Sequence, residues 1–502
     1  MSPIKLIVSS KNNLQFKYGK NFSKIEALLN KLKAADKTRG LDTKIIFIDD
    51  PKSAKVAGIK KVTSISEKEC KRAIDDLYKK YIPAYVAILG AGDVIPFHEI
   101  VNPAEDEDTT APSDLPYACD AGYSKTIDAY TGPTRVVGRI PDIPGLQKDT
   151  SYLEKMITTS IKQKPINPDQ YRNYFAVTAQ VWKVSTQMSL QSMFSDNKKL
   201  FQSPVKNEKT PAKYSKAQLK PLTHFFNCHG AKTDPSYYGQ KGNNYPEALR
   251  SSNLEKNISP GTVIAAECCY GAQLFDPTVL QPQESCIANI YLENGAIAML
   301  GSSTIAYGPS DSNSLADLIT SYFIKSLLTG ASSGRALLEA RQKFLSDSGP
   351  QLDPYELKTL AQFYLLGDPS VQPAIREDVA DSKTTGGSIE NNRLNLFNKG
   401  VSLKNSLAPS KKQKVKSKPG DPKKLKEILK ASNFENAEKE FVYDVKGKGA
   451  GLTGLQKKLA GTNARFRTFI KPGTADDVFN IKVLVVKEDN QQVLGWRVYE
   501  SR

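Results

Sequence analysis

Two short stretches of this 502-residue chain hold a cysteine and a histidine where an apolar run gives way to glycine. In TVIAAECCYG the run ends at Cys268 and Cys269, and in THFFNCHG it ends at His229 and Gly230. A thiolate is a strong nucleophile toward a carbonyl carbon, and a nearby imidazole can favour the thiolate and protonate a departing amine. Gly230 allows a substrate backbone to approach closely, and its N–H can donate to a developing oxyanion. These residue types are sufficient for acyl transfer.

The two adjacent cysteines are not equivalent. Successive side chains of a strand point to opposite faces, so we expect Cys269 to face the histidine and Cys268 to pack in the core. A zinc site formed by Cys228, His229, Cys268 and Cys269 is a weaker interpretation, because the C-x₂₋₄-C spacing of structural zinc sites is absent. A vicinal disulfide between Cys268 and Cys269 is also weaker, because it would need a strained backbone. Of the other histidines, we expect His224 in the core or at the surface and His98 at the surface.

The two motifs belong to a pattern that alternates apolar runs with helical stretches up to about residue 375. KIIFIDD, AYVAILGAGDVIPF, TRVVGRI, NYFAVTAQVW and GAIAMLGSS favour strands, whereas FSKIEALLNKLKAADK and SEKECKRAIDDLYKKY have the apolar period of a helix. Such alternation predicts βαβ units around a mostly parallel sheet whose strands are covered on both faces. Open sheets of this kind place catalytic groups at the carboxyl ends of strands, so His229 and Cys269 can converge there.

The length of the chain predicts at least two domains, since single cores stop growing at roughly 250 to 300 residues. The composition, with 39% hydrophobic and 25% charged residues, is that of a globular protein. The N-terminal apolar stretch is too short for a signal-peptide core, and no segment approaches the roughly 18 apolar residues of a membrane span. Six scattered cysteines form no secreted disulfide framework. We therefore expect a cytoplasmic protein that makes no membrane contact.

Composition divides the chain into three parts. Residues 1–375 form the α/β part, with an N-terminal subdomain at about 1–150 and a catalytic subdomain at about 151–375. Residues 376–425 are rich in Lys, Ser, Asn, Gly and Pro, which predicts a flexible linker, and residues 426–502 predict a small α+β domain of unknown role. The net charge of +17 and the lysine run of the linker suggest contact with a polyanion, although a solvated tether is the simpler interpretation.

The histidine and cysteine motifs resemble those of the clan CD cysteine peptidases, which include caspases, legumains and gingipains. ECCYG is similar to the caspase pattern Gln-Ala-Cys-x-Gly, with Cys268 in place of the small Ala and Cys269 in place of the nucleophile. The wider context resembles the gingipain-type family over roughly residues 1–372, because five further segments occur in the expected order: VAILGAGDVIPF, SDLPYACDAG, GRIPDIPG, ESCIANIYLENGAIAMLGSS and FYLLGDPSV.

The resemblance implies a caspase-like α/β/α sandwich and a thiol protease, a cysteine endopeptidase that acts on proteins or peptides without a metal or an organic cofactor. Carried over to this sequence, Cys269 is the nucleophile, His229 the general acid/base, and the N–H groups of Gly230 and Cys269 the oxyanion hole. In gingipains an acidic residue helps to orient the histidine. The aligned position here is Thr134, which leaves the third member of the site open.

The resemblance also concerns specificity and regulation. Gingipains and legumains prefer one particular residue before the scissile bond, and an acidic pocket would select Arg or Lys. Asp114, Asp120 and Asp142 lie in loops near the family's pocket-forming region, although surface carboxylates are commonly only solvated. Glu267 stands where caspases have Gln, and it either faces the pocket or caps the strand. Relatives are often activated by processing or an effector, and the Lys-rich linker is a candidate site of self-cleavage.

A second hypothesis comes from a different class of protein. In it the peptidase fold is inactive, and the basic linker and the C-terminal domain recruit a partner or a polyanion as a scaffold. The intact His-Gly and Cys-x-Gly motifs favour the enzyme, whereas Thr134 favours the scaffold. Labelling by a thiol-reactive peptide distinguishes the two hypotheses.

Overall fold

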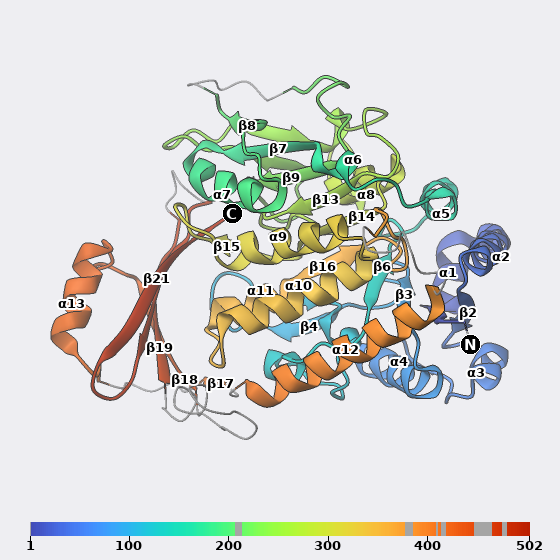
Figure 1. The fold of residues 1–502 in the computed structure, drawn as a ribbon, viewed down its shortest axis with the longest axis horizontal. Helices are drawn as coiled ribbons and strands as arrows, with labels where there is room; N and C mark the ends of the chain where they lie inside the picture. The colour runs from blue at the N-terminus through green and yellow to red at the C-terminus, as the bar shows by residue number, and fades with distance from the viewer. Residues whose placement is uncertain are drawn as a thin grey trace.

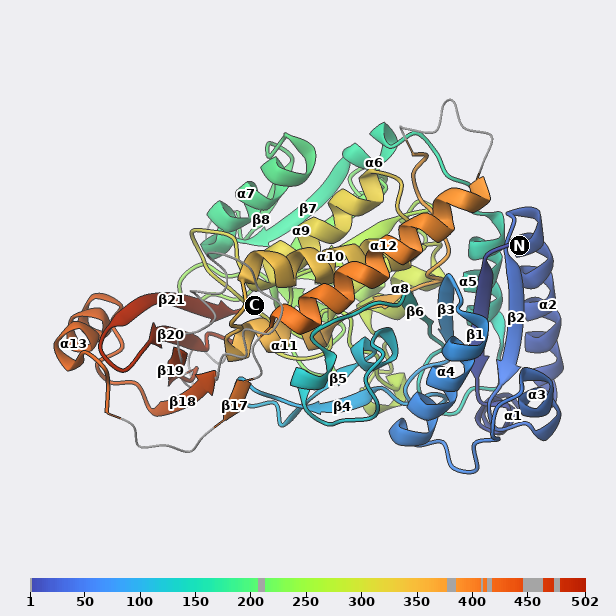
Figure 2. The same cartoon turned by 60° about the horizontal axis from the view of Figure 1, so that its bottom comes forward.

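The main body of the molecule is a ten-stranded sheet with helices on both faces (Figures 1 and 2). The computed structural model describes residues 2–205, 213–376, 385–407, 410–412, 418–445, 464–473 and 479–502. The strands of the large sheet are, in spatial order, β2 (Asp42–Phe47), β1 (Ile4–Ser9), β3 (Tyr85–Leu89), β6 (Val137–Ile140), β16 (Phe363–Leu366), β14 (Ala298–Ser302), β13 (Val263–Ala266), β9 (Thr223–Asn227), β7 (Tyr174–Ala179) and β8 (Leu200–Ser203).

Neighbouring strands of this sheet are parallel except for β14 and β16. The sheet therefore has two parallel halves that run in opposite directions and meet at this pair. Strands β7, β9, β13 and β14 are buried along their whole length, which agrees with apolar runs covered on both sides. In this second half, the carboxyl ends of four neighbouring strands lie along one edge.

The helices complete the three layers. Helices α2 (Phe22–Thr38), α5 (Ser151–Lys162) and α8 (Ile287–Glu293) contribute to the core on one face of the sheet, and α7 (Lys183–Phe194), α9 (Leu315–Leu328) and α10 (Ser333–Ser348) contribute to the core on the other. The smaller elements of the body are α1 (Lys11–Tyr18), α3 (Pro51–Ala57), α4 (Glu67–Tyr81), β4 (His98–Val101), β5 (Thr110–Ser113), α6 (Asp169–Arg172), β10 (His229–Gly230), β11 (Ser236–Tyr238), β12 (Glu247–Arg250) and α11 (Pro354–Gln362). The predicted caspase-like α/β/α sandwich is confirmed.

The C-terminal part forms an antiparallel sheet that is continuous with the peptidase body. In spatial order its strands are β15 (Tyr307–Gly308), β21 (Val493–Ser501), β20 (Lys482–Glu488), β19 (Ala464–Lys471), β18 (Lys439–Val445) and β17 (Ser410–Lys412). Strand β15 belongs to the body, so the last strand of the chain is hydrogen-bonded to it, and Figure 1 shows β21 leading into the body.

Both faces of this second sheet are covered. On β20, Val483 and Val485 join the core of the peptidase body, whereas Leu484 and Val486 pack with helix α13 (Pro422–Ala431). This strict alternation follows from the two-residue period of a strand. The sheet is therefore fixed between the body and α13.

The predicted linker, residues 376–425, contains a helix, α12 (Thr385–Ser406), which packs along α10 (Figure 1). Leu396, Gly400 and Leu403 of the helix and Leu407 directly after it recur at helical spacing and are among the less exposed positions of the segment, but its polar composition hid this period. The expectation of a flexible linker is therefore wrong for this helix. Residues 408–409 and 413–417 of the lysine run lie outside the described residues, so polyanion contact stays a prediction.

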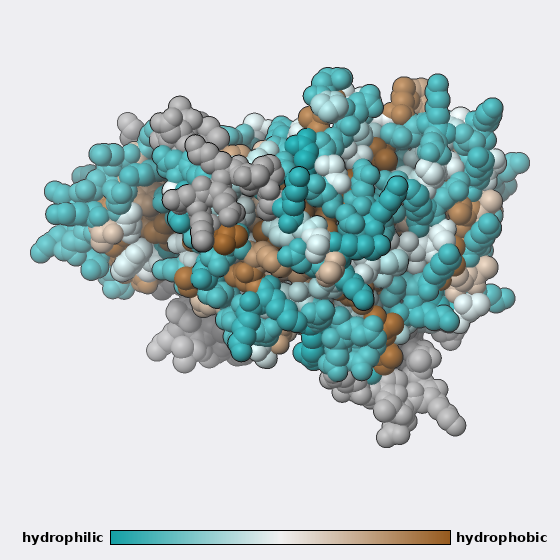
Figure 3. Space-filling model, turned by 90° about the horizontal axis from the view of Figure 1, so that it is seen from above, coloured by the Kyte–Doolittle hydropathy of each residue, from teal (hydrophilic) through white to brown (hydrophobic). Residues whose placement is uncertain are grey.

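In the stretch KKLKEILKASNFENAEKEF the helix ends at Ala431, and strand β18 begins at Lys439. None of the described helices is long and apolar enough to cross a membrane. The face shown in Figure 3 is mostly hydrophilic, with apolar residues in small separate patches.

Candidate active site

His229 and Cys269 follow two neighbouring parallel strands, β9 and β13. Their segments are in contact, because a Cβ built on Gly230 would lie 2.0 Å from the carbonyl oxygen of Cys269. Only glycine fits this position. Cys268 is fully buried in the core on one face of the sheet, and Cys269 belongs to the core on the other face. Strand alternation therefore separates the two cysteines as expected.

The imidazole of His229 is held by a glutamine. Its Nε2 lies 2.7 Å from Oε1 of Gln240, while the amide nitrogen of Gln240 donates to the Gly242 carbonyl and the Tyr245 hydroxyl. These two donations orient the amide so that its oxygen faces the ring, which places the imidazole proton on Nε2 and the lone pair on Nδ1. Trp182 packs against the same ring at 4.3 Å between centroids.

Gln240 contacts the imidazole in the way that the gingipain-type pattern leads us to expect of an acidic residue. Thr134, the position aligned with that acid, lies beside Gly400 of helix α12 and donates its N–H to the Ala118 carbonyl. The neutral amide orients the imidazole without adding a charge.

The segment that precedes β15 holds the thiol of Cys269. The N–H of Ala306 lies 3.3 Å from Sγ, and burial raises the pKa of this thiol well above its ordinary value. Asp108 anchors the segment, because its carboxylate accepts from the Ile305 N–H at 2.9 Å and from the Tyr270 hydroxyl at 2.7 Å. Lys358 pairs with the same carboxylate at 2.9 Å. In this state the sulfur is a covered, neutral thiol.

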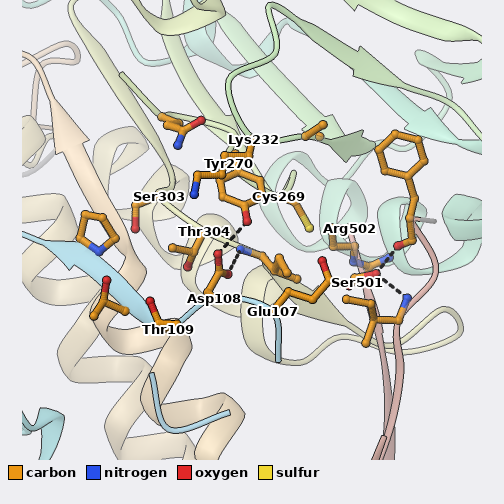
Figure 4. Close-up of a pocket in the computed structure, with 18 of the residues that line it drawn as sticks. Glu107, Asp108, Thr109, Lys232, Cys269, Tyr270, Ser303, Thr304, Ser501 and Arg502 are labelled. Atoms are coloured by element: carbon orange, nitrogen blue, oxygen red, sulfur yellow. Dashed lines mark hydrogen bonds between the residues drawn. The ribbon is translucent and has the colours of Figure 1, made fainter. Parts of the chain in front are cut away.

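The backbone of Arg502 lies beside Cys269, the predicted nucleophile (Figure 4). The Cys269 N–H donates to the Arg502 carbonyl oxygen at 3.0 Å, and the Arg502 N–H donates to the Ala306 carbonyl oxygen at 2.9 Å. The two preceding residues pair antiparallel with β15, Ser501 opposite Tyr307. The chain end therefore lies as an extended peptide whose last carbonyl faces an expected oxyanion donor.

The side chain of Arg502 fills a closed pocket beside the thiol. Its Nη2 donates to the two carboxylate oxygens of Asp317 at 3.1 and 3.3 Å and to the Pro309 carbonyl at 2.8 Å. The guanidinium lies 4.5 Å from the centre of the Trp182 ring, which allows a cation–π contact. A Cβ built on Gly308 would lie 2.2 Å from Nη2, so a glycine at this position makes room for the guanidinium.

A second carboxyl group, Glu267, lies at the base of this pocket. Burial and the neighbouring Asp317 raise the pKa of Glu267 well above its ordinary value, which favours its protonated form. Its Oε1 accepts from the Thr320 hydroxyl at 3.2 Å. With Glu267 protonated, the two carboxyl groups present one negative charge to one arginine. Of the two interpretations offered for Glu267, its position beside Arg502 favours the pocket.

The other acidic residues predicted for the pocket pair elsewhere in the described structure. Asp114 makes a two-fold hydrogen bond to the Arg139 guanidinium, Asp120 is exposed and lies 3.7 Å from Arg135, and Asp142 pairs with Lys17 at 2.7 Å. None of the three contacts Arg502 among the described residues. They stabilise the N-terminal half, where basic side chains neutralise them.

The remaining histidines are both in the core. His224 accepts or donates a 2.7 Å hydrogen bond with the Tyr291 hydroxyl, within the range of placements we expected. His98 is fully buried against Tyr117, so the expectation of a surface position is wrong. It lies on the same buried face of β4 as Ile100, whereas Glu99 and Val101 lie on the other face.

A cleft of about 650 Å³ opens at Cys269 and Arg502 (Figure 4). Its walls are both polar and apolar and come from four segments of the body and from residues 479–481 and 501–502; they include Glu107, Thr109, Lys232, Gln273 and Ser303. Part of the active-site region is therefore open, while the arginine pocket is filled.

Several residues of the site were not identified from the sequence. Trp182 follows β7 and Ala306 follows β14, so both lie at the strand edge that the alternating pattern predicts. Asp317 has a local signal, since Ser314 and Asp317 form a capping box at the start of α9. Gln240 and Arg502 carry no local signal.

Comparison with known proteins identifies the family of this chain. The profile of peptidase family C25 matches residues 6–374. A solved structure titled "Structure of Protease" has 12% sequence identity and a TM-score of 0.47, with 99% of this chain and 97% of that chain covered. A search of curated proteins finds no match. Because the family profile spans most of the peptidase body, the chain belongs to peptidase family C25, the gingipain family of clan CD cysteine peptidases.

Proposed function

We propose that this protein is a cysteine endopeptidase that cleaves peptide bonds on the carboxyl side of arginine. The observation that carries the proposal is the position of Arg502, whose carbonyl faces the Cys269 N–H while its guanidinium contacts Asp317. An arginine of a substrate bound in this way would present its carbonyl carbon to the thiolate of Cys269. Family membership supports the same reaction class.

The proposed reaction uses the groups in a fixed order. The substrate strand pairs with residues 306–308, and its carbonyl accepts from the Cys269 N–H, with the Gly230 N–H as the second donor implied by the family. Nδ1 of His229 takes the proton of the Cys269 thiol, and the sulfur attacks the carbonyl carbon, so that an S–C bond forms and the oxygen becomes an oxyanion. The oxyanion then collapses to a carbonyl as the C–N bond breaks, and His229 gives the proton taken from the thiol to the leaving amine. Water hydrolyses the thioester, with His229 as the base.

The pocket supports selection of arginine over lysine. A guanidinium offers several N–H donors in one plane and can contact a carboxylate, a carbonyl and an aromatic ring together. Asp317, the Pro309 carbonyl and Trp182 occupy these three positions around Arg502. A lysine ammonium is a point charge on a longer apolar stem, so it would not use the aromatic wall in the same way.

The test is hydrolysis of a fluorogenic peptide that ends in arginine before the reporter group. Replacement Cys269→Ala removes the nucleophile, so kcat should fall by on the order of 10⁴-fold or more. The matched control is Cys268→Ala, a neighbouring buried cysteine whose loss should leave most activity intact. His229→Ala should also inactivate the protein.

The contrary result is also specific. Measurable hydrolysis at the same rate by Cys269→Ala and the unmodified chain would refute the assignment of the nucleophile. Labelling with an arginine chloromethyl ketone gives a second readout, because the sulfur attacks the methylene carbon and chloride leaves. A correctly folded protein in which Cys269 is never labelled would instead support the inactive scaffold.

The environment of the protein is part of the proposal. All six cysteines are free thiols, and a catalytic thiolate needs a compartment in which it stays reduced. We therefore place the protein in the cytoplasm. Thiol titration of the protein isolated without reductant should find the six thiols, and a disulfide would contradict the placement.

A further inference from the structure

The last strand of the chain uses the same contacts that a bound substrate would need. The Arg502 N–H and carbonyl bond to Ala306 and Cys269, and the two residues before it pair with β15. Addition of an extended peptide to an exposed strand is a common mode of peptide recognition, in which the backbone gives affinity and side-chain pockets give specificity. Here one chain provides both the strand, β15, with its side-chain pocket and the extended peptide that pairs with it.

The side chains of the strand are matched to the site as well as its backbone. Arg502 fills the pocket of Asp317 and Trp182, and Glu500 accepts from the Trp182 indole N–H at 3.2 Å. Trp182 also packs against His229. Residues 500–502 therefore cover the proposed nucleophile, fill the proposed specificity pocket and contact Trp182, the residue that packs against His229.

The remainder of the C-terminal domain keeps this end in place. Strand β21 pairs with β20 over seven residue pairs, and β20 is buried between the peptidase body and α13. A tethered ligand has an effective concentration on the order of millimolar, against which a free substrate must compete. Occupation of the site therefore does not depend on the concentration of the protein.

We infer that residues 500–502 inhibit this peptidase from within the same chain, with Arg502 bound as the residue before a scissile bond would be. This inference rests on the proposed function, since the pocket that holds Arg502 is the pocket proposed for the substrate. A substrate can enter only after the end of β21 has left. The cleft beside Cys269 stays open in the inhibited state. Residues 500–502 therefore exclude the arginine of a substrate and the residues before it, but they do not fill the rest of the cleft.

The experiment compares the full chain with Arg502→Ala and with a deletion of Ser501 and Arg502. The rate constant for labelling of Cys269 by an arginine chloromethyl ketone should rise by about tenfold or more in both variants, as expected when a millimolar tethered competitor is lost. The KM for an arginine reporter should fall while kcat stays similar. Arg172→Ala, an exposed arginine on α6, is the matched control and should behave like the unmodified chain.

A peptide with the sequence VYESR provides the reverse test. Added to the deletion variant, it should inhibit competitively, whereas VYESA should not. Equal labelling rates for the full chain and both variants would overturn the inference and leave the proposed function intact. Absence of labelling in all three proteins would instead refute the proposed function, and the inference with it.

A measurement on the unmodified chain covers the case in which a variant does not fold. Covalent labelling of Cys269 by the arginine reagent must expel Arg502 from its pocket. Hydrogen exchange of the amides of residues 500–502 should therefore become faster after labelling, because the bonds of Ser501 and Arg502 to Ile481 and Ala306 are lost. Unchanged protection of these amides in the labelled protein would overturn the inference.

Discussion

At the scale of single residues, the charge of the arginine pocket depends on two carboxyl groups with different protonation. Burial and the nearby carboxylate raise the pKa of Glu267, which favours its neutral form, and Asp317 is the carboxyl group that contacts the guanidinium. Two buried negative charges would repel each other and would exceed the charge of one arginine. The two residues should therefore respond differently when each is replaced by its amide.

Asp317→Asn should lower kcat/KM for an arginine substrate by about 10- to 100-fold, because a hydrogen bond between charged groups contributes roughly 1.5–3 kcal/mol. Glu267→Gln should cost much less, since it replaces one neutral group by another. The measurement is best made with Arg502→Ala as the parent, so that the chain end does not compete for the pocket.

A citrulline reporter, in which a neutral urea replaces the guanidinium, is the control for charge. It should be a poor substrate for the parent, and Asp317→Asn should change its kcat/KM only slightly. Asp169→Asn, at an exposed site of α6, should change neither substrate. A loss of equal size for both reporters would mean that Asp317 acts through the fold of α9 and not through its charge.

At the scale of elements, the sequence predicted the strands that carry His229 and Cys269 because their apolar runs are continuous and end at polar or glycine positions. The parallel arrangement then followed from the alternation with helices, and with it the common edge of the strands. Glu267 was named because it stands where caspases have Gln, two residues before the predicted nucleophile Cys269.

The parts of the site that could not be predicted come from contacts between distant segments. Arg502 reaches the site through a strand of another sheet, and no local pattern reports that pairing. Gln240 lies in a short irregular hairpin after β11, where hydrogen bonds and not periodicity fix the position. Asp114 and Asp142 looked equally suitable in sequence, because their partners Arg139 and Lys17 become visible only in the folded chain.

The packing of α12 is another contact between distant segments that no local pattern predicted, and it can be tested. Leu407, which directly follows α12, is buried in a core cluster with residues of α10 and α11, whereas Leu394 on the helix is 51% exposed. Leu407→Ala should lower the free energy of unfolding by about 2 kcal/mol, the lower end for buried leucines. Leu394→Ala should change it by less than about 0.5 kcal/mol. Guanidinium denaturation of both variants measures this, and equal small effects would show that α12 does not stabilise the body.

At the scale of the whole molecule, the contact between β21 and helix α11 couples the C-terminal sheet to the peptidase body. Arg497 of β21 pairs with Glu356 at 3.2 Å, and Tyr499 donates to Asp353 at 3.1 Å. Asp353 on the same helix and Lys487 on β20 also face Glu356. Burial, reinforced by the charge of Asp353, raises the pKa of Glu356 to about 8 from an ordinary value of 4.5.

This raised pKa gives the inhibition a pH dependence. If residues 497–501 of β21 and Arg502 leave the body, Glu356 is exposed to water and its pKa returns toward 4.5. Between about pH 4.5 and 8 the docked state therefore holds more protons than the released state. A rise in pH through this window therefore favours release of the strand. The contribution of the protonated carboxyl to docking is fully present at the acidic end and is lost as the pH passes 8.

The measurement is the ratio of the Cys269 labelling rate in the full chain to that in Arg502→Ala. Ionisation of the thiol affects both proteins alike and cancels in the ratio. The ratio should increase toward one between pH 6 and pH 9 if release of the strand limits access. Glu356→Gln, which keeps a neutral group at the junction, should flatten this dependence. A ratio that stays constant in the unmodified chain would show that the end of β21 leaves the site without disturbing its contact with α11.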